Sequence, residues 1–168
     1  MSNNPNKRDF KPLNIAVMTV SDTRTEANDT SGDTLVKLLT GAGHVLAEKR
    51  IVPDDIYRIR AAASQWIADC DINVVITTGG TGIGPKDFTP EVVREFLDKE
   101  IPGIMELIRM KYGQEKPNAL LSRGVAGVMG QTLVYVLPGS VKAVNEYMEE
   151  ITNTMQHLFY MLNGLDVH

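Results

Sequence analysis

Short apolar runs alternate along this chain with longer segments in which apolar residues recur every three or four positions. The runs at residues 14–20, 44–52 and 72–78 have the length of β-strands. The last run, INVVITT, is β-branched almost throughout, as expected of a strand that is buried on both faces of a sheet. These runs therefore predict three strands of a covered sheet.

The segments between these runs predict two amphipathic helices. The first begins with a capping-box-like start at residues 30–33 and ends at Gly41 and Gly43. The second follows Pro53, and Asp54 stands where its N-cap would be. The order strand, helix, strand, helix, strand is typical of a mostly parallel sheet with helical crossovers.

The middle of the chain contains a glycine-rich segment and then further helical signals. Thr89 at a cap position and Pro90 at the first helical position predict a short helix. Residues 102–103, Pro-Gly, are expected to break it, and another helix is predicted over residues 104–112.

The last third of the chain predicts a hairpin and a long helix. Residues 125–129 and 132–137 flank Gly130 and Gln131, a pattern typical of a β-hairpin. An apolar stripe over residues 141–162 predicts the final helix. The predicted fold is therefore α/β, a three-layer sandwich with a mostly parallel sheet, helices on both faces and an antiparallel edge hairpin.

Composition narrows the class of protein. The 168 residues, 43% hydrophobic and 23% charged, are those of one globular domain, which we assign to residues 14–168. Residues 1–13 are expected to form a flexible N-terminal arm without the apolar core of a secretory signal. No apolar run approaches the roughly 20 residues that span a bilayer, so no membrane association is expected. The single cysteine excludes an internal disulfide and favours a cytoplasmic protein.

The charge of the chain limits its ligands. A net charge of −4 argues against a general affinity for nucleic acid. An anionic ligand would have to be held by local donors or by a metal ion.

Polar segments follow each of the predicted parallel strands. In open α/β sheets, ligands bind in the crevice beyond the carboxyl ends of the strands. Those ends carry residues 21–24, 53–55, 79–87 and 138–140, all polar or glycine-rich. We therefore expect the binding site to be built from these four segments.

The glycine loop at residues 79–87 is the strongest candidate for a phosphate site. Glycine lets backbone N–H groups approach a ligand with no Cβ in the way, and successive N–H groups form an anion-binding nest. The loop is not a P-loop, because Pro85 stands where that motif needs lysine. The alternative is that the glycines only turn a tight corner, although they are more numerous than a turn requires.

The aspartates near the loop have two interpretations each. Asp87, beside an anion-binding nest, is either a Mg²⁺ ligand or an acid favoured by the dipole of the helix that follows. For Asp54, spacing alone favours a simple N-cap. Asp22 and Arg24 could belong to an ordinary turn, and Ser140 could simply cap the last helix.

Six segments carry a family resemblance: SDTR at 21–24, DTSG at 29–32, VPDD at 52–55, TTGGTGIGPKDFTPE at 77–91, LLSRGVAGV at 120–128 and LPGS at 137–140. Together they resemble the molybdenum cofactor biosynthesis family of MoaB and MogA, which is also found in plant and animal proteins such as gephyrin. TTGGTG followed by D-x-T-P-E is the most specific part. The chain length and the hairpin are more similar to MoaB than to the longer MogA.

The resemblance implies a nucleotidyltransferase. The phosphate of molybdopterin, a pterin with a dithiolene, would be joined to the AMP part of Mg-ATP, giving adenylyl-molybdopterin and pyrophosphate. The family's two functional acids match Asp54 and Asp87, which are therefore expected to be catalytic and to hold Mg²⁺. Arg24 or Lys86 would add positive charge. The expected substrate-binding residues are Ser21, Asp22, Thr78, Gly79, Gly80, Thr81, Gly82, Ser122, Pro138, Gly139 and Ser140.

The resemblance also implies partners and one alternative. Because members of the family form trimers or hexamers, a homo-trimer or homo-hexamer is expected, and other molybdenum cofactor synthesis proteins are candidate partners. The alternative is a non-catalytic carrier that hands molybdopterin to a paralogous adenylyltransferase. Some MoaB proteins lack the first acid, whereas this chain retains Asp54, which favours the enzyme.

Overall fold

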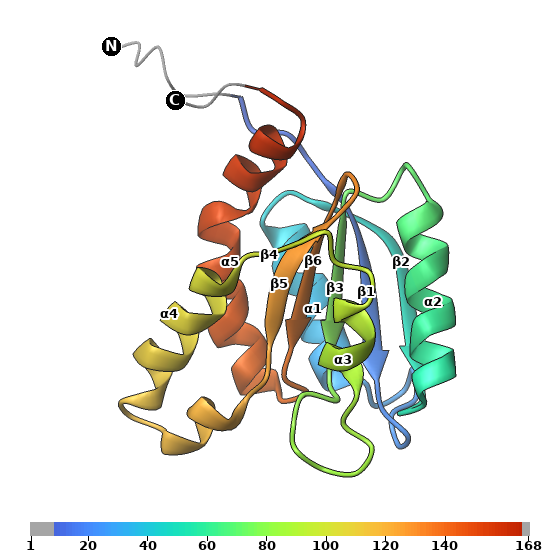
Figure 1. Cartoon of the computed structure of the whole chain (residues 1–168), viewed down its shortest axis with the longest axis vertical. Coiled ribbons are helices and arrows are strands. Elements are labelled where there is room, and N and C mark those ends of the chain that lie inside the picture. Colours follow the sequence, from blue (N-terminus) through green and yellow to red (C-terminus); the bar gives the residue numbers. More distant parts are fainter. Residues whose placement is uncertain (1–8, 166–168) are drawn as a thin grey trace.

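The computed structural model describes residues 9–165 and contains one six-stranded sheet with the order β2-β1-β3-β6-β5-β4 (Figure 1). The four strands β2, β1, β3 and β6 run parallel to one another, and β5 runs antiparallel to β6. Their bounds are β1 Asn14–Val20, β2 Val45–Val52, β3 Val74–Thr78, β4 Lys99–Glu100, β5 Val125–Met129 and β6 Thr132–Leu137. The predicted fold class is confirmed. The sequence did not predict β4, a two-residue strand that pairs outside β5 and forms the edge.

Helices cover both faces of this sheet. Figure 1 shows α3 in front of the sheet and α1 behind it. The cluster on the face of α1, α4 and α5 contains Val74 and Ile76, and the cluster on the face of α2 and α3 contains Val75. Side chains alternate along a strand, so Val74, Val75 and Ile76 are all apolar because β3 is buried on both faces. The helices are α1 Thr30–Gly41, α2 Ile56–Ala68, α3 Thr89–Arg94, α4 Pro102–Gly113 and α5 Val141–Leu162, with a 3₁₀ helix η1 at Pro117–Leu121.

The apolar stripe of α5 packs on the protein's own sheet. Val144, Ile151 and Met155 are fully buried in the same cluster as the strand residues. The hairpin before α5 is confirmed, and Gly130 turns its two-residue loop with a φ of +56° that favours glycine.

Four helix starts differ from the predicted ones. The carboxylate of Asp29, not the hydroxyl of Thr30, caps α1 and accepts from the Gly32 N–H at 3.1 Å. Asp55, not Asp54, caps α2, because its extended backbone directs the carboxylate to the Arg58 N–H at 3.0 Å. Asp54 is thus released from the structural role that spacing favoured.

The other two starts involve proline. Phe88 occupies the N-cap position of α3 without a side-chain cap, so Thr89 lies inside the helix and the prediction of a Thr89 cap is wrong. Pro102, expected to break a helix, instead begins α4, because the first helical position needs no N–H donor.

Part of the expected N-terminal arm is packed against the domain. Leu13 is fully buried, and the Gln156 side chain exchanges hydrogen bonds with the backbone of Lys11 at 3.1 and 2.7 Å. Residues 1–8 of the expected arm lie outside the described residues, as do residues 166–168 of the expected domain. Within residues 9–165, no helix is both long and apolar enough to cross a membrane.

Candidate functional site

A cavity of about 370 Å³ lies at the carboxyl ends of the parallel strands. It brings together nine of the residues proposed from the sequence: Ser21, Asp54, Thr78, Gly79, Gly80, Thr81, Gly82, Asp87 and Gly139. Thr19, Val20, Arg24 and Ser31 complete its lining. Strand ends that lie far apart in the sequence therefore meet where the strand-end rule predicts.

Two glycines of the loop after β3 have backbone conformations and neighbours that exclude a side chain. Gly79 and Gly80 have φ values of +102° and +68°. A Cβ on Gly79 would lie 2.3 Å from the Val20 carbonyl oxygen, and one on Gly80 would lie 2.2 Å from Thr89 Oγ1. The loop is thus pressed onto the end of β1 and the start of α3.

The same loop presents backbone donors without partners. The Gly79 N–H donates to the Leu137 carbonyl at 2.9 Å and closes the sheet. Among the described residues, the next N–H groups, at residues 80–83, donate no hydrogen bond. Successive unpaired N–H groups beside a cavity form a nest for an anion.

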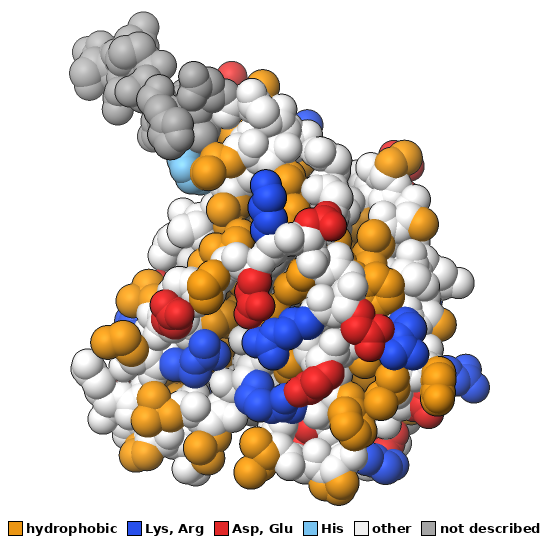
Figure 2. All heavy atoms as spheres, viewed as in Figure 1, with side chains coloured by type: hydrophobic (Ala, Val, Ile, Leu, Met, Phe, Trp, Pro, Cys, Tyr) orange, Lys and Arg blue, Asp and Glu red, His pale blue; other side chains and the backbone are white. Residues whose placement is uncertain are grey.

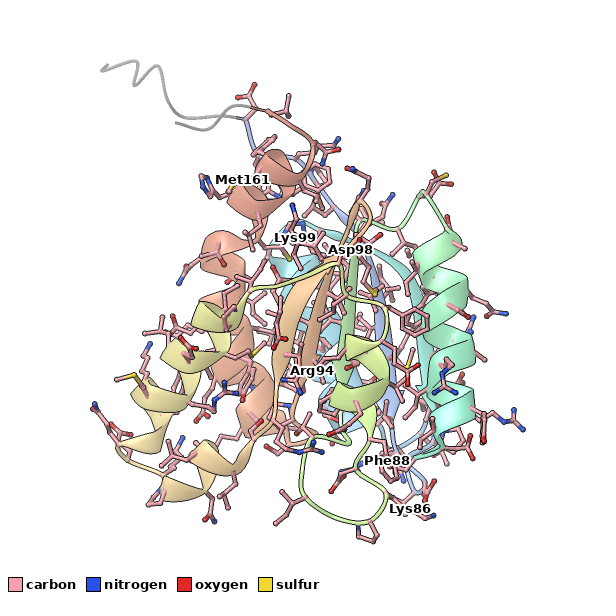
Figure 3. The ribbon with its side chains drawn as sticks, in the orientation of Figure 1. Lys86, Phe88, Arg94, Asp98, Lys99 and Met161 are labelled. Atoms are coloured by element: carbon pink, nitrogen blue, oxygen red, sulfur yellow. The ribbon has the colours of Figure 1, made fainter. Side chains whose placement is uncertain are left out.

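Asp87 closes the loop from its other end. Its Oδ2 accepts from the Gly84 N–H at 2.8 Å, and a Cβ on Gly82 would lie 2.7 Å from that oxygen. The glycines therefore wrap around this carboxylate, which lines the cavity together with the nest. Figure 3 shows Lys86 and Phe88 at this lower end of the molecule, whereas Asp98 and Lys99 lie toward the other end.

Asp22 and Asp54 hold each other across the ends of β1 and β2. The Asp22 N–H donates to Asp54 Oδ2 at 3.0 Å, and the Asp54 N–H donates to Asp22 Oδ1 at 2.9 Å. Lys86 Nζ pairs with Asp22 Oδ2 at 2.6 Å. Asp22 lies outside the cavity lining and acts instead as the partner of Asp54.

The two carboxyl groups differ in their proton affinity. The hydrogen bond from Lys86, and then the N–H of Asp54, hold the pKa of Asp22 below its ordinary value. Burial raises the pKa of Asp54, and the negative charges of Asp22 and Asp87 raise it further, against the hydrogen bond from the Asp22 N–H and the charge of Lys86. A group at the cavity with a raised pKa is a candidate functional acid.

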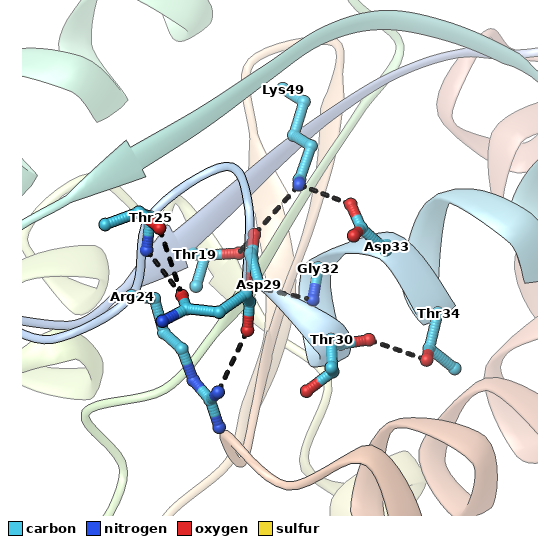
Figure 4. A network of polar contacts seen from close by, with 10 residues as sticks. Thr19, Arg24, Thr25, Asp29, Thr30, Gly32, Asp33, Thr34 and Lys49 are labelled. Atoms are coloured by element: carbon cyan, nitrogen blue, oxygen red, sulfur yellow. Dashed lines mark hydrogen bonds and ion pairs between the residues drawn. The ribbon is translucent and has the colours of Figure 1, made fainter.

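A polar network around Asp29 contacts Thr19, one of the residues that line the cavity (Figure 4). Asp29 is fully buried, and its Oδ2 accepts from Thr19 Oγ1 at 2.8 Å and pairs with Lys49 Nζ at 3.0 Å. Lys49 also pairs with Asp33 at 2.6 Å. Burial opposes the charge of Lys49, but the hydrogen bonds with Asp33 and Asp29 raise its pKa overall. Arg24 donates to the Asn28 carbonyl at 2.9 Å and so stabilises its own loop.

A second cavity of about 240 Å³ lies on the other side of the turn after β6. Three residues expected at the substrate site, Ser122, Pro138 and Ser140, line it rather than the first cavity. Gly139 between them lines the first cavity, so the turn separates the two. Ser140 also caps α5 by accepting from the Ala143 N–H at 3.2 Å, and Ser122 Oγ accepts from the Tyr147 hydroxyl at 2.9 Å.

Comparison with known proteins decides the family. Residues 16–157 match the model of a family described as a probable molybdopterin binding domain. The chain belongs to this family. Molybdenum cofactor biosynthesis protein B of Escherichia coli (strain K12) is 43% identical over 144 residues, which are 85% of each chain. The protein of the same name from Bacillus cereus is 42% identical over 143 residues, 84% of this chain and 85% of that one.

Solved structures of the MoaB/MogA family have the same fold. A crystal structure of molybdenum cofactor biosynthesis protein B aligns with a TM-score of 0.89 at 39% identity, covering 94% of this chain and 99% of that one. The molybdopterin biosynthesis enzyme MoaB of Thermus thermophilus aligns with a TM-score of 0.83 at 38% identity, covering 90% and 97%. The molybdenum cofactor biosynthesis family expected from the motifs is therefore confirmed.

Some residues of this MoaB/MogA-family site were not singled out from the sequence. Asp29 and Arg123 lie within the quoted motifs but were given no role, and Lys49 lies outside them. Asp29 and Arg123 both contact residues that line the cavity. An acid directly before an amphipathic helix was a detectable signal for Asp29. Nothing local indicated Lys49 or Arg123, because their partners lie far away in the sequence.

Proposed function

We propose that this protein binds molybdopterin and adenylylates it with Mg-ATP, releasing pyrophosphate and giving adenylyl-molybdopterin. One observation carries the proposal: a nest of unpaired N–H groups and two carboxylates, Asp54 and Asp87, line the same cavity. A phosphate needs the donors, and a nucleotide with its cation needs the carboxylates. The single cysteine suits a reducing compartment, so we expect the reaction in the cytoplasm.

The chemistry needs positioning more than covalent participation by the protein. An oxygen of the molybdopterin phosphate attacks the α-phosphorus of ATP, a P–O bond forms, and the bond to the β-phosphate oxygen breaks. The N–H groups of residues 80–83 would hold phosphate oxygens so that the attacking and leaving oxygens are in line. Holding the two reactants in this geometry supplies much of the rate enhancement of phosphoryl transfer.

The carboxylates fit the cation that accompanies ATP. In the described part of the chain, no group of three or more His, Cys, Asp or Glu side chains could hold a metal by itself. Mg²⁺ is usually held by one or two carboxylates together with water and substrate phosphates, which is the donor set that Asp54 and Asp87 offer. When bound, it would neutralise charge on the ATP phosphates.

The second cavity suits the ring system of the pterin. Ile108, Tyr112 and Tyr147 give it apolar walls, and Ser122 and Ser140 give it polar groups. Flat aromatic ligands bind in mostly apolar cavities with a few polar groups that orient them. The phosphate and the ring of one molecule would then lie on opposite sides of Gly139.

An oligomer is the assembly we propose for the protein in solution. The exposed apolar residues of α4 and η1, Leu107, Met110, Leu120 and Leu121, give a surface that a second copy could cover. Light scattering after size-exclusion chromatography, with a mass of three or six chains, would support a homo-trimer or homo-hexamer.

Incubation with molybdopterin and α-labelled ATP, with and without Mg²⁺, tests the function. We expect an AMP-linked product only with Mg²⁺. Asp87→Asn should reduce turnover at least about a hundredfold, equivalent to about 2.7 kcal/mol, while leaving molybdopterin binding nearly intact. Asp55→Asn is the matched control, because asparagine still caps α2 and Asp55 lies outside the cavity lining.

Two results would count against the proposal. Near-normal adenylylation by Asp87→Asn would remove the metal role of that residue. Molybdopterin binding without any AMP-linked product from the wild-type protein would instead favour the non-catalytic carrier.

A further inference from the structure

Arg123 lies just before β5 and contacts the glycine loop at three carbonyl groups. Its Nε and Nη2 donate to the Gly82 oxygen at 2.9 and 2.7 Å, and Nη2 also donates to the Asp87 oxygen at 2.8 Å. Its own N–H donates to the Thr81 oxygen at 3.2 Å. One residue thus holds both the beginning and the end of the loop that closes on Asp87.

These bonds determine where the loop's N–H groups point. In a trans peptide, the C=O and the N–H that follows it are directed to opposite sides. Since the oxygens of Thr81 and Gly82 point to Arg123, the N–H groups of Gly82 and Ile83 point away from it. These two belong to the unpaired N–H groups of the nest.

The shape of the guanidinium matters here more than its charge. Nη1 pairs with Glu91 on α3, so the positive charge already has a carboxylate partner within the protein. The planar fork can reach two carbonyls and this carboxylate at the same time, which a lysine ammonium on a flexible stem does not match. Arg109 in turn donates to the carbonyls of Ser122 and Gly124, the two neighbours of Arg123, at 3.3 and 3.5 Å.

We propose that Arg123 is a positioning residue that keeps the glycine loop in its anion-binding shape. Arg123 does not itself line the cavity, and its guanidinium acts through the carbonyls of two residues that do, Gly82 and Asp87. The inference rests on the proposed function, in which the nest receives phosphate oxygens. It adds to the machinery that binds the phosphate a residue that lies 41 positions from Gly82 in the sequence.

The test is to titrate the full chain with inorganic pyrophosphate in the absence of Mg²⁺. Binding is monitored by NMR through the amide chemical shifts of residues 80–83. Arg123→Lys should weaken pyrophosphate binding about tenfold, because the loop loses the stabilisation of about one hydrogen bond. Arg60→Lys is the matched control. Arg60 also donates two hydrogen bonds from its guanidinium, both to Glu95 at 2.8 Å, but within the described chain it does not contact the glycine loop. The Arg60→Lys variant should bind pyrophosphate as the wild type does.

Two further measurements separate positioning from general stability. In Arg123→Ala, millimolar guanidinium should restore part of the affinity, which a merely structural loss would not allow. Glu91→Gln removes the carboxylate partner but keeps the carbonyl contacts, and it should weaken binding no more than about twofold. This variant also tests the inference if the Arg123 variants fail to fold.

The outcomes are distinct. Tight pyrophosphate binding by Arg123→Lys, or a Glu91→Gln defect as large as that of Arg123→Lys, would overturn the role of Arg123. No binding by the wild-type protein would overturn the nest itself and with it the proposed function.

Discussion

The Asp29 network and the glycine loop lie at the same end of the sheet but use their polar groups in opposite ways. Around Asp29, the carboxylate is fully buried and accepts from Thr19, Gly32 and Lys49. In the loop, the N–H groups of residues 80–83 donate to nothing within the described chain. The Asp29 carboxylate is thus paired within the fold, whereas the N–H groups of the loop remain available as donors.

This contrast separates support from site more clearly than residue type does. Both regions contain aspartate, threonine and glycine, so residue type alone does not distinguish them. The Asp29 carboxylate is paired, as buried polar groups almost always are, whereas the N–H groups of residues 80–83 have no partner in the described chain. Figure 2 shows acidic and basic side chains interspersed on one face of the molecule, so the long-range field of that face does not identify the site either.

Removing Asp29 should have the largest effect on stability. Asp29→Ala would leave Lys49 without its buried partner and α1 without its cap, so we expect a loss of roughly 3–5 kcal/mol. The midpoint of thermal unfolding should fall on the order of 10 °C.

The other carboxylate partner of Lys49 provides the control for Asp29. The side chain of Asp33 is 63% exposed, so Asp33→Asn should cost less than about 1 kcal/mol. Equal losses from the two variants, compared by denaturant titration, would show that burial does not distinguish the two ion pairs.

A side chain on Gly80 should disturb the loop without destroying the domain. Gly80→Ala places a Cβ at a φ of +68° and 2.2 Å from Thr89 Oγ1, and we expect a loss of roughly 2–4 kcal/mol. Pyrophosphate binding should be lost with it. Gly41→Ala, with nothing within 4 Å of its Cβ, should leave both properties unchanged.

A second-site change can establish that the Gly80 effect comes from the contact with Thr89. Thr89 Oγ1 is buried and has no hydrogen-bond partner among the described residues, so Thr89→Ala alone should cost little. Combined with Gly80→Ala, it should recover part of the lost stability. Strict additivity in this double-mutant cycle would contradict the proposed clash.

The sequence predicts the frame of this molecule well because its signals are local. Strands β1, β3 and β6 are mostly apolar with no alternation of polar residues, which predicts that both faces of each strand are covered. The rule that ligands bind at strand ends then locates the cavity. The helix starts were less predictable, since Asp54 and Asp55 are neighbours and only the backbone conformation decides which one caps α2.

Contacts between distant segments were beyond reach of sequence reasoning. Arg123 contacts Gly82 of the loop although the two residues are 41 positions apart in the sequence. The two-residue strand β4 is defined by its pairing with β5. Ser122 and Ser140 were expected to bind the same substrate as the glycine loop, but they line a separate cavity on the other side of the turn at Gly139. Such pairings depend on the folded topology and leave no periodic trace.

The smallest expected effect concerns Asp54, whose ionised carboxylate lowers the stability of the folded protein at neutral pH. Because burial raises its pKa above the ordinary value of 3.8, the folded protein binds a proton there more readily than the unfolded chain. The stabilising effect of that proton is complete below pH 3.8 and is lost as the pH rises through the raised pKa. Asp54→Asn, which still accepts from the Asp22 N–H, should therefore be slightly more stable at pH 7 than the wild type.

Thermal unfolding of both proteins between about pH 3.5 and pH 8 measures this difference, which should disappear at the acid end, where the wild-type carboxyl group is also protonated. Adenylylation should respond in the opposite sense, because the neutral side chain no longer offers a charged ligand to the cation. If Asp54→Asn is more stable but less active, Asp54 serves ligand binding, like the unpaired N–H groups of the loop, and lowers the stability of the fold. A variant that loses stability at every pH would place it with Asp29 instead.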